Sequence, residues 1–263
     1  NLADGIPAER QRQALLKITE LYLAQDRIPE AIETFERFLA QYPKAASADL
    51  ALLTVGELRM HQHKAGLDNK DITSAATNAP AVTNSLQLAL TAFSTLTNAF
   101  PQSPFAGKAQ LDLGWCLWLE GRTPEAQAAF QAAVERLPFG ADQAKACFRL
   151  ADAQFQQMHY AEAIRNYQLI IEKFAEVPEA RTNLFERALS QTVRASLATN
   201  DLATATNTLR KMLAWYPDRL DTSRAMLLTG QEISLRGDPL GARKMFLEFT
   251  NTAPRSPLLP ELQ

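Results

Sequence analysis

The residue types that most often bind metals or catalyse reactions are scarce in this sequence. Its three histidines are His61, His63 and His159. His61 and His63 lie two residues apart, so on a helix they point about 200° from each other and cannot chelate one ion. If the helix frays there, Asp68 and Asp71 could join them, but a third well-spaced soft ligand is missing. The sequence therefore predicts no metal site, and His159 is expected to be solvated.

Motifs for covalent or cofactor chemistry are also missing. The sequence has no glycine-rich phosphate loop, no Gly-x-Ser-x-Gly elbow and no Cys-x-x-Cys pair. It therefore predicts a protein that is not an enzyme and needs no cofactor. Cys116 and Cys147 are expected to be buried free thiols, since cysteine packs as a small hydrophobe. A disulfide is the alternative, and it requires Cα atoms within about 7 Å.

Binding chemistry is indicated by cations that recur at regular intervals. Lys108, Lys145, Arg187 and Arg224 are 37, 42 and 37 residues apart. A row of cations on one face would attract an acidic peptide or a chain carboxylate. The alternative is that long cations near exposed helix starts only lay their stems on the surface.

The same intervals govern a pattern that must position these side chains. An alanine is followed four residues later by a bulky apolar residue, and in most cases by a proline eight residues after that. This pattern occurs six times, anchored on Ala31, Ala89, Ala126, Ala163, Ala205 and Ala242, at intervals of 58, 37, 37, 42 and 37 residues. A fixed period of this length is typical of a helical repeat architecture.

Each repeat reads as two helices with a sharp turn between them. Apolar residues in 105–120 follow a helical spacing, and Gly121 to Pro124 break it. Small residues stand twelve positions before the anchoring alanine, at Gly56 (after removal of an insertion), Gly114, Ala151 and Gly230. We expect them to permit close approach of the second helix, with the anchoring alanine as their counterpart and the aromatics facing the next repeat.

Counting back from each alanine places further side chains on the face of the cations. The position eleven before it holds Trp115, Asp152 and Arg194, and the position eight before it holds Trp118 and Phe155. Tryptophan is enriched at binding hot spots. The predicted binding residues are Lys108, Trp115, Trp118, Lys145, Asp152, Phe155, Arg187, Arg194 and Arg224. A packing role for the aromatic residues is the alternative.

The residues Leu113-Gly114, Gly121, Ala126, Phe130, Ala133 and Pro138 resemble the tetratricopeptide repeat. The endings Pro101-Gln-Ser-Pro104 and Pro254-Arg-Ser-Pro257 resemble bacterial envelope members of that class, such as the Tol–Pal coordinator and the outer-membrane assembly lipoprotein. The resemblance implies an all-α, right-handed α-α superhelix of about six helix pairs. It also implies a non-enzymatic scaffold that binds a peptide or partner helix in a concave groove.

One specialised form of such a scaffold is not expected. Repeats that grip chaperone C-termini use Lys and Asn, then Asn, then Lys and Arg in three successive repeats. Lys145 and Arg149 fit the last pair, but Leu53, Glu57 and Asp112 stand where Lys, Asn and Asn belong.

The sequence predicts a single solenoid over 1–263. Its repeats are expected at 8–43, 44–101, 102–138, 139–178, 179–217 and 218–254, with 255–263 as the start of a further helix in a longer parent protein. Residues 64–84 are expected to form an inserted loop, either a tolerated mobile insertion or a partner-binding loop.

Net charge and hydropathy bound the partners and the compartment. A net charge of −2 favours neither nucleic acid nor an anionic membrane, and no apolar run suggests direct membrane insertion. A protein or peptide partner is expected, with a homo-oligomer or a structural spacer in a longer solenoid as the alternative. The expected location is a bacterial periplasm or envelope, with the cytoplasm as the alternative.

Overall fold

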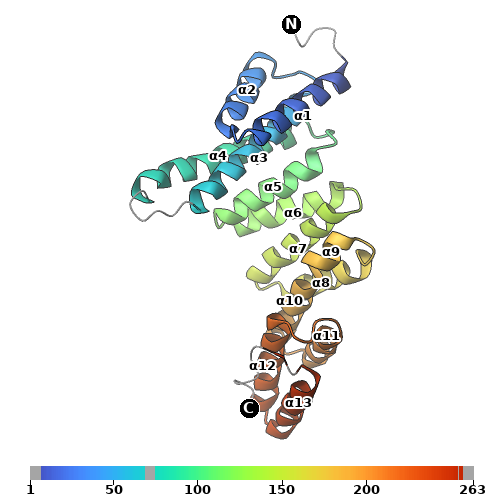
Figure 1. Ribbon diagram of the computed structural model, residues 1–263. Coiled ribbons are helices and arrows are strands. Elements are labelled where there is room, and N and C mark those ends of the chain that lie inside the picture. The colour runs from blue at the N-terminus through green and yellow to red at the C-terminus, as the bar shows by residue number, and fades with distance from the viewer. Residues whose placement is uncertain (1–6, 69–74, 254, 257–263) are drawn as a thin grey trace. The chain divides into compact units, whose positions relative to one another are not determined.

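The computed structural model describes residues 7–68, 75–253 and 255–256, without the side chains of Ala8 and 75–83. The described residues form thirteen α-helices and no strand, in two compact units, Asn1–Leu137 and Pro138–Gln263 (Figure 1). The all-α class with six helix pairs is thereby confirmed. The expected start of a helix at 255–263 lies almost wholly outside the described residues, and a single solenoid over the whole chain stays a prediction.

The first unit contains three helix pairs. They are α1 (Ala8–Ala24) with α2 (Ile28–Gln41), α3 (Ala48–Asp68) with α4 (Ala75–Ala99), and α5 (Ala106–Leu119) with α6 (Thr123–Arg136). Its core has two parts. One joins α1, α2 and α3 around Phe35 and Leu50, and the other joins α3, α4 and α5 around Phe93 and Ala109.

The second unit contains three further pairs and one additional short helix. The pairs are α7 (Ala141–Gln156) with α8 (Tyr160–Lys173), α10 (Phe185–Ala198) with α11 (Leu202–Trp215), and α12 (Leu220–Leu235) with α13 (Pro239–Thr252). Helix α9 (Pro178–Asn183) lies between the first two pairs. A core around Val193, Met212 and Phe249 joins α10, α11, α12 and α13.

Five of the six helix turns share one backbone conformation. The residue five before the anchoring alanine has a left-handed φ, between 54° and 91°, at Asp26, Gly121, Met158, Asn200 and Gly237. Glycine and asparagine tolerate this conformation best, whereas it strains methionine. The repeat register therefore fixes the turn even where the residue type is unsuited to it.

The anchoring alanines are buried in all six repeats, as the pattern predicts. The prediction about their counterparts is wrong, because the small residue faces the aromatic ring of its own repeat. A Cβ atom added to Gly114 would lie 2.6 Å from Phe130 Cδ1, and one added to Gly56 would lie 2.6 Å from Phe93 Cζ. The ring occupies the space that the missing side chain leaves, so the aromatic residue packs between the two helices of its own pair.

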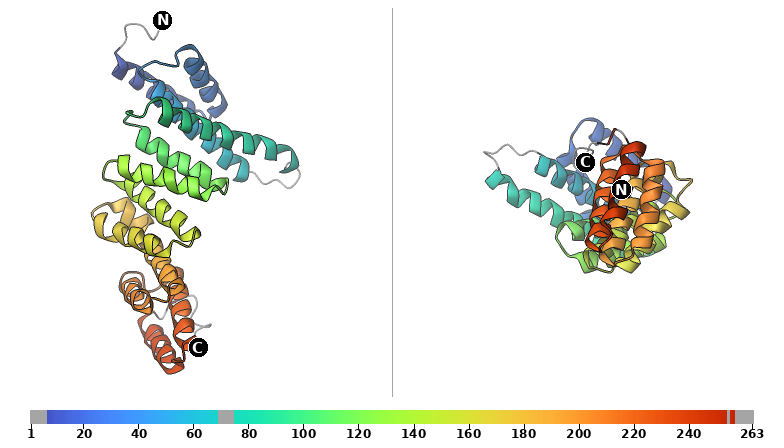
Figure 2. Two further views of the ribbon diagram at one scale, coloured as in Figure 1. Left: turned by 180° about the vertical axis from the view of Figure 1, so that it is seen from behind. Right: turned by 90° about the horizontal axis from the view of Figure 1, so that it is seen from below.

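The inserted segment is largely helical, and the expected loop over 64–84 is corrected accordingly. Helix α3 continues to Asp68, and α4 already begins at Ala75 (Figure 2). Extending an existing helix costs less than starting one, and alanine, frequent at the start of α4, favours that extension. Residues 69–74 lie outside the described part of the chain.

Both cysteines are buried free thiols, as predicted. Burial raises the pKa of Cys116 to about 12, with Asp112 and Glu120 adding to the effect, and raises the pKa of Cys147 to about 11. No described helix combines the length and the hydropathy that crossing a bilayer requires.

Candidate functional site

A polar cluster in the second unit is centred on the carboxylate of Asp152 on α7. Its side chain is only 10% exposed. Asp152 Oδ1 accepts a hydrogen bond of 2.7 Å from the hydroxyl of Tyr167 on α8, and Oδ2 lies 3.3 Å from Arg149 Nη1. Tyr167 is the fully buried residue four after the anchoring alanine. Its position in the repeat pattern therefore places its hydroxyl next to Asp152.

Two arginines of α10 lie over aromatic rings of α7. The guanidinium of Arg187 is 4.6 Å from the ring centroid of Phe148, and that of Arg194 is 5.2 Å from the ring centroid of Phe155. Phe155 also meets Tyr160 edge to face at 5.2 Å. Cation–π contacts of this kind contribute roughly 0.5–2 kcal/mol and hold a guanidinium in place without neutralising it.

Burial dominates the protonation of this cluster. It raises the pKa of Asp152 above its ordinary value, although the Tyr167 hydroxyl, Arg149 and Arg187 all favour the ionised form. Burial likewise lowers the pKa of Arg149 and raises that of Tyr167. Burial therefore destabilises the ionised carboxylate, and its three neighbours stabilise it. This balance is typical of a structural or positioning role.

The remaining predicted residues of the second unit are exposed cations next to acids of their own helices. Lys145 Nζ lies 2.8 Å from Asp142, and Arg224 Nη1 lies 3.7 Å from Asp221. Exposed pairs of this type contribute little to stability and open readily for a ligand. Arg187 and Arg194 lie beside Asp152 and Phe155, whereas no contact joins Lys145 or Arg224 to that cluster in the described residues.

The first unit carries the other three predicted residues, all on α5. Trp115 and Trp118 are half-buried, so each presents part of its ring to solvent. Lys108 Nζ lies 2.6 Å from Asp112 and 3.5 Å from Glu57, so two carboxylates compensate its charge. A groove that combines these residues with those of the second unit remains a prediction.

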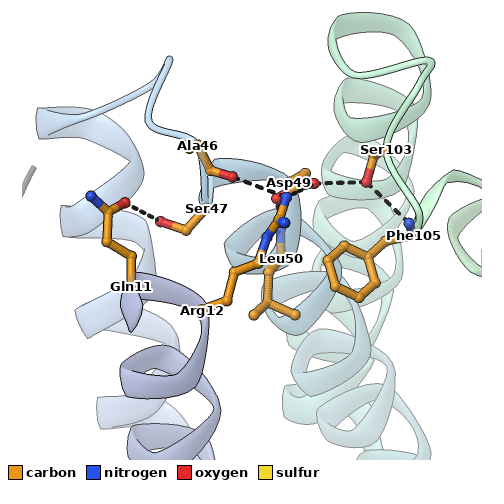
Figure 3. A network of polar contacts seen from close by, with 8 residues as sticks. All are labelled: Gln11, Arg12, Ala46, Ser47, Asp49, Leu50, Ser103 and Phe105. Atoms are coloured by element: carbon orange, nitrogen blue, oxygen red, sulfur yellow. Dashed lines mark hydrogen bonds and ion pairs between the residues drawn. The ribbon is translucent and has the colours of Figure 1, made fainter. Parts of the chain in front are cut away.

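A second polar network, in the first unit, was not predicted from the sequence (Figure 3). Asp49 on α3 is 5% exposed, and its Oδ2 lies 3.0 Å from Arg12 Nη2 on α1. The same oxygen accepts a hydrogen bond of 2.8 Å from the hydroxyl of Ser103, just before α5. Ser103 in turn accepts from the backbone N–H of Phe105 at 3.0 Å. One carboxylate thereby ties together the first helices of three successive pairs.

The signal that could have revealed this network is the serine of the Pro-x-Ser-Pro endings. Ser103 reaches Asp49, and Ser256 reaches Ser223 at 2.6 Å. Asp49 and Ser223 occupy the same position, nineteen residues before their anchoring alanines once the insertion is removed. The serine therefore fastens each repeat ending to the first helix of the preceding pair.

The described residues were also compared with the ligand sets that metal ions require. They contain no group of three or more His, Cys, Asp or Glu side chains placed to hold a metal ion. Asp71, one of the fallback ligands considered for His61 and His63, lies outside them.

Comparison with protein families gives two matches. Residues 7–114 match a family described as outer membrane lipoprotein, and residues 108–139 match a tetratricopeptide repeat family. Comparison with curated protein sequences gives no match.

Solved structures share the fold at low sequence identity. A structure of BtubC from P. vanneervenii is 15% identical, with 89% of this chain and 90% of that chain covered and a TM-score of 0.54. A structure of MamA is 18% identical, with 66% and 92% covered and a TM-score of 0.50. A signal transduction ATPase with a tetratricopeptide repeat sensor, from Pyrococcus horikoshii, is 13% identical, with 98% and 38% covered and a TM-score of 0.54. The helix pairs and these solved structures show that the chain has the fold of tetratricopeptide repeat proteins, with residues 7–114 resembling a family of outer membrane lipoproteins and residues 108–139 a tetratricopeptide repeat family.

Proposed function

We propose that the chain binds an acidic peptide or partner helix through one face of its second unit, as part of a bacterial envelope assembly. This face, called the α7–α10 face, consists of Phe148 and Phe155 of α7 and Arg187 and Arg194 of α10. The tetratricopeptide fold implies a protein–protein interaction scaffold, and such repeats are typically non-enzymatic. The observation that carries the finer proposal is the pair of arginines held over Phe148 and Phe155. The envelope location is supported by the likeness of residues 7–114 to outer membrane lipoproteins.

The chemistry of this face suits a carboxylate that is flanked by apolar side chains. A guanidinium offers a planar fork of donors that matches a carboxylate. Phe155 and Tyr160 supply half-buried apolar surface next to Arg194. Asp152, shielded beneath the surface by Tyr167 and Arg149, would keep the cations oriented without competing strongly for them.

Affinity capture with the full chain tests the proposal. The immobilised protein is exposed to an envelope extract of the source organism, and captured proteins are quantified by mass spectrometry. Joint charge reversal, Arg187→Glu with Arg194→Glu, should reduce the specific captures by about 10-fold or more, because each hydrogen bond to a charged group contributes roughly 1.5–3 kcal/mol. Raising the salt concentration should weaken the wild-type capture in the same direction.

The matched control reverses two exposed arginines on second helices, Arg165→Glu on α8 and Arg210→Glu on α11. It carries the same change in net charge and should leave the captured set unchanged. Equal loss in both double variants would show a general charge effect, and equal retention would exclude the α7–α10 face as the binding surface.

The second candidate function is a spacer or self-association segment, which the α12–α13 pair favours. The bulky apolar residue four after the anchoring alanine is buried in the five preceding repeats, as at Phe93, Phe130 and Leu209, yet Phe246 stays half-buried. It lines an open pocket of about 610 Å³ together with the exposed Leu247. Concentration-dependent light scattering that Leu247→Glu abolishes would support self-association.

A further inference from the structure

A pocket of about 480 Å³ lies in the second unit, between the end of α8, the short helix α9, the start of α10 and the end of α11. Its walls include Glu176, Arg181, Phe185, Trp215 and Tyr216. None of these residues belongs to the α7–α10 face. The pocket is a separate feature of the same unit.

The pocket exists because the connection between α8 and α10 is longer than the others in the unit. The anchoring alanines Ala163 and Ala205 are 42 residues apart, against the usual 37. The additional chain forms α9, which Pro178 starts at its first position. Helix α9 contributes Arg181, and the displaced start of α10 contributes Phe185.

Three aromatic rings form most of the apolar wall, together with Ile171 and Ala175. Phe185 is 5% exposed and fixed in the core, and the ring of Trp215 lies 6.5 Å from it at an interplanar angle of 29°. Tyr216 meets Trp215 edge to face at 6.4 Å. Trp215 is 49% exposed, and it is therefore more exposed than either Trp115 or Trp118. A solvent-facing tryptophan that packs on a buried ring beside a concave surface suits a binding hot spot, where tryptophan is enriched.

The charges around the rings select the partner. Arg219 lies 3.8 Å from Glu186, so these two charges compensate each other. In the described part of the chain, the guanidinium of Arg181 makes no hydrogen bond or ion pair and is available to a carboxylate. Glu176, also in the wall, disfavours a second acidic group. The pocket is therefore complementary to one carboxylate next to one aromatic ring.

We propose that this pocket binds an extended peptide of a protein partner, with one aromatic side chain stacked on Trp215 and one adjacent carboxylate held by Arg181. Offset stacking of the ring on indole and the guanidinium–carboxylate fork act on neighbouring side chains of the same peptide. This site is independent of the α7–α10 face, so either proposal can fail alone.

The test begins with a displayed random heptapeptide library that is selected on the full chain and counter-selected on Trp215→Ala. The enriched peptides should contain Phe, Tyr or Trp next to a single Asp or Glu. For the best peptide, fluorescence anisotropy should show about a 10-fold loss of affinity in Arg181→Gln, since a charge-assisted hydrogen bond contributes roughly 1.5 kcal/mol or more. Arg210→Gln is the matched control and should not change the affinity.

A double-mutant cycle makes the assignment specific. Replacing the acidic residue of the peptide by its amide should weaken binding to the wild type but should add nothing in Arg181→Gln. Arg187→Glu with Arg194→Glu should leave this peptide bound. Enrichment of the same peptides on Trp215→Ala, or undiminished affinity in Arg181→Gln, would overturn the proposal. Because Trp215 is half-exposed, circular dichroism of Trp215→Ala should match the wild type, and Trp215→Phe gives a milder second variant.

Discussion

Asp49 in the first unit and Asp152 in the second are both largely buried carboxylates on the first helix of a pair, but they hold different parts of the molecule. Asp49 joins Arg12 of α1 and Ser103 of the segment before α5, so it links successive pairs. Asp152 bonds to Tyr167 within its own pair and lies beneath a face that carries Arg187 and Arg194. The same type of buried charge thus links successive pairs in one unit and lies within a single pair, close to exposed arginines, in the other.

The comparison also shows why the two carboxylates tolerate burial. Asp49 accepts from a guanidinium, a hydroxyl and the backbone N–H of Leu50, at 2.8 Å for the last. Asp152 accepts a short bond from the Tyr167 hydroxyl and a hydrogen bond from Gln191, and the charges of two arginines, Arg149 and Arg187, favour its ionised form, whereas Asp49 pairs with Arg12. The first acid should therefore depend more strongly on its arginine than the second.

Matched substitutions of the two arginines should give the largest difference. Arg12→Met keeps most of the stem but leaves Asp49 buried without its cation, which we expect to cost about 3 kcal/mol in the free energy of unfolding. Arg149→Met should cost less than about 1 kcal/mol, because it also removes a cation whose burial is unfavourable. Urea denaturation followed by circular dichroism measures both, and equal costs would break the comparison.

The two buried cysteines report which unit is affected. Cys116 lies in the first unit and Cys147 in the second, and burial raises the pKa of each thiol to about 12 and about 11. Labelling at pH 8 should therefore require local opening. Arg12→Met should accelerate labelling of Cys116 more than that of Cys147, as read by peptide mass spectrometry. Faster labelling of Cys147 than of Cys116 would show that Arg12→Met destabilises the second unit, against the prediction.

Tyr167→Phe should destabilise the second unit by about 1.5–3 kcal/mol, because it removes a hydrogen bond to a buried charged group. The effect should depend on pH. The hydroxyl lowers the pKa of Asp152 against the raising effect of burial, so its loss raises that pKa further. The difference from wild type should then be smallest below the ordinary value of 3.8 and grow as pH rises through the raised pKa.

Urea midpoints at pH 4 and pH 7 measure this dependence. Ile170→Val, a change at a fully buried residue of α8 that has no titratable group, serves as the control and should show no such growth. A pH-independent cost of Tyr167→Phe would contradict the assigned role of the hydroxyl.

Ser103→Ala should have the smallest effect, about 1 kcal/mol, since Asp49 keeps Arg12 and the Leu50 N–H. Ser223→Ala tests the corresponding serine contact with Ser256 in the second unit and should cost a similar amount. No change in the free energy of unfolding in Ser103→Ala would show that the hydrogen bond from Ser103 to Asp49 does not stabilise the fold.

Fold and site differ in how far the sequence anticipates them. The alanine period predicts the helix pairs and the buried anchors because one repeat needs only local spacing and its nearest neighbour. It misplaces the partner of Gly114, because two helices related by the same period can meet through either the alanine or the ring. It also reads 64–84 as a loop, since turn-forming composition outweighs the ease of extending a helix that already exists.

By itself, the sequence determined the repeat class, the six pairs, the turn positions and the lack of recognisable catalytic motifs. Only the tertiary structure decided that Arg194 lies over Phe155, that Tyr167 reaches Asp152, that Ser103 reaches Asp49 and that Trp215 borders a pocket. The physical reason is that repeat spacing and side-chain contacts depend on different degrees of precision in helix placement. Repeat spacing fixes which face each side chain is on, whereas contacts of 3 to 6 Å depend on how each helix is rotated and shifted against the next.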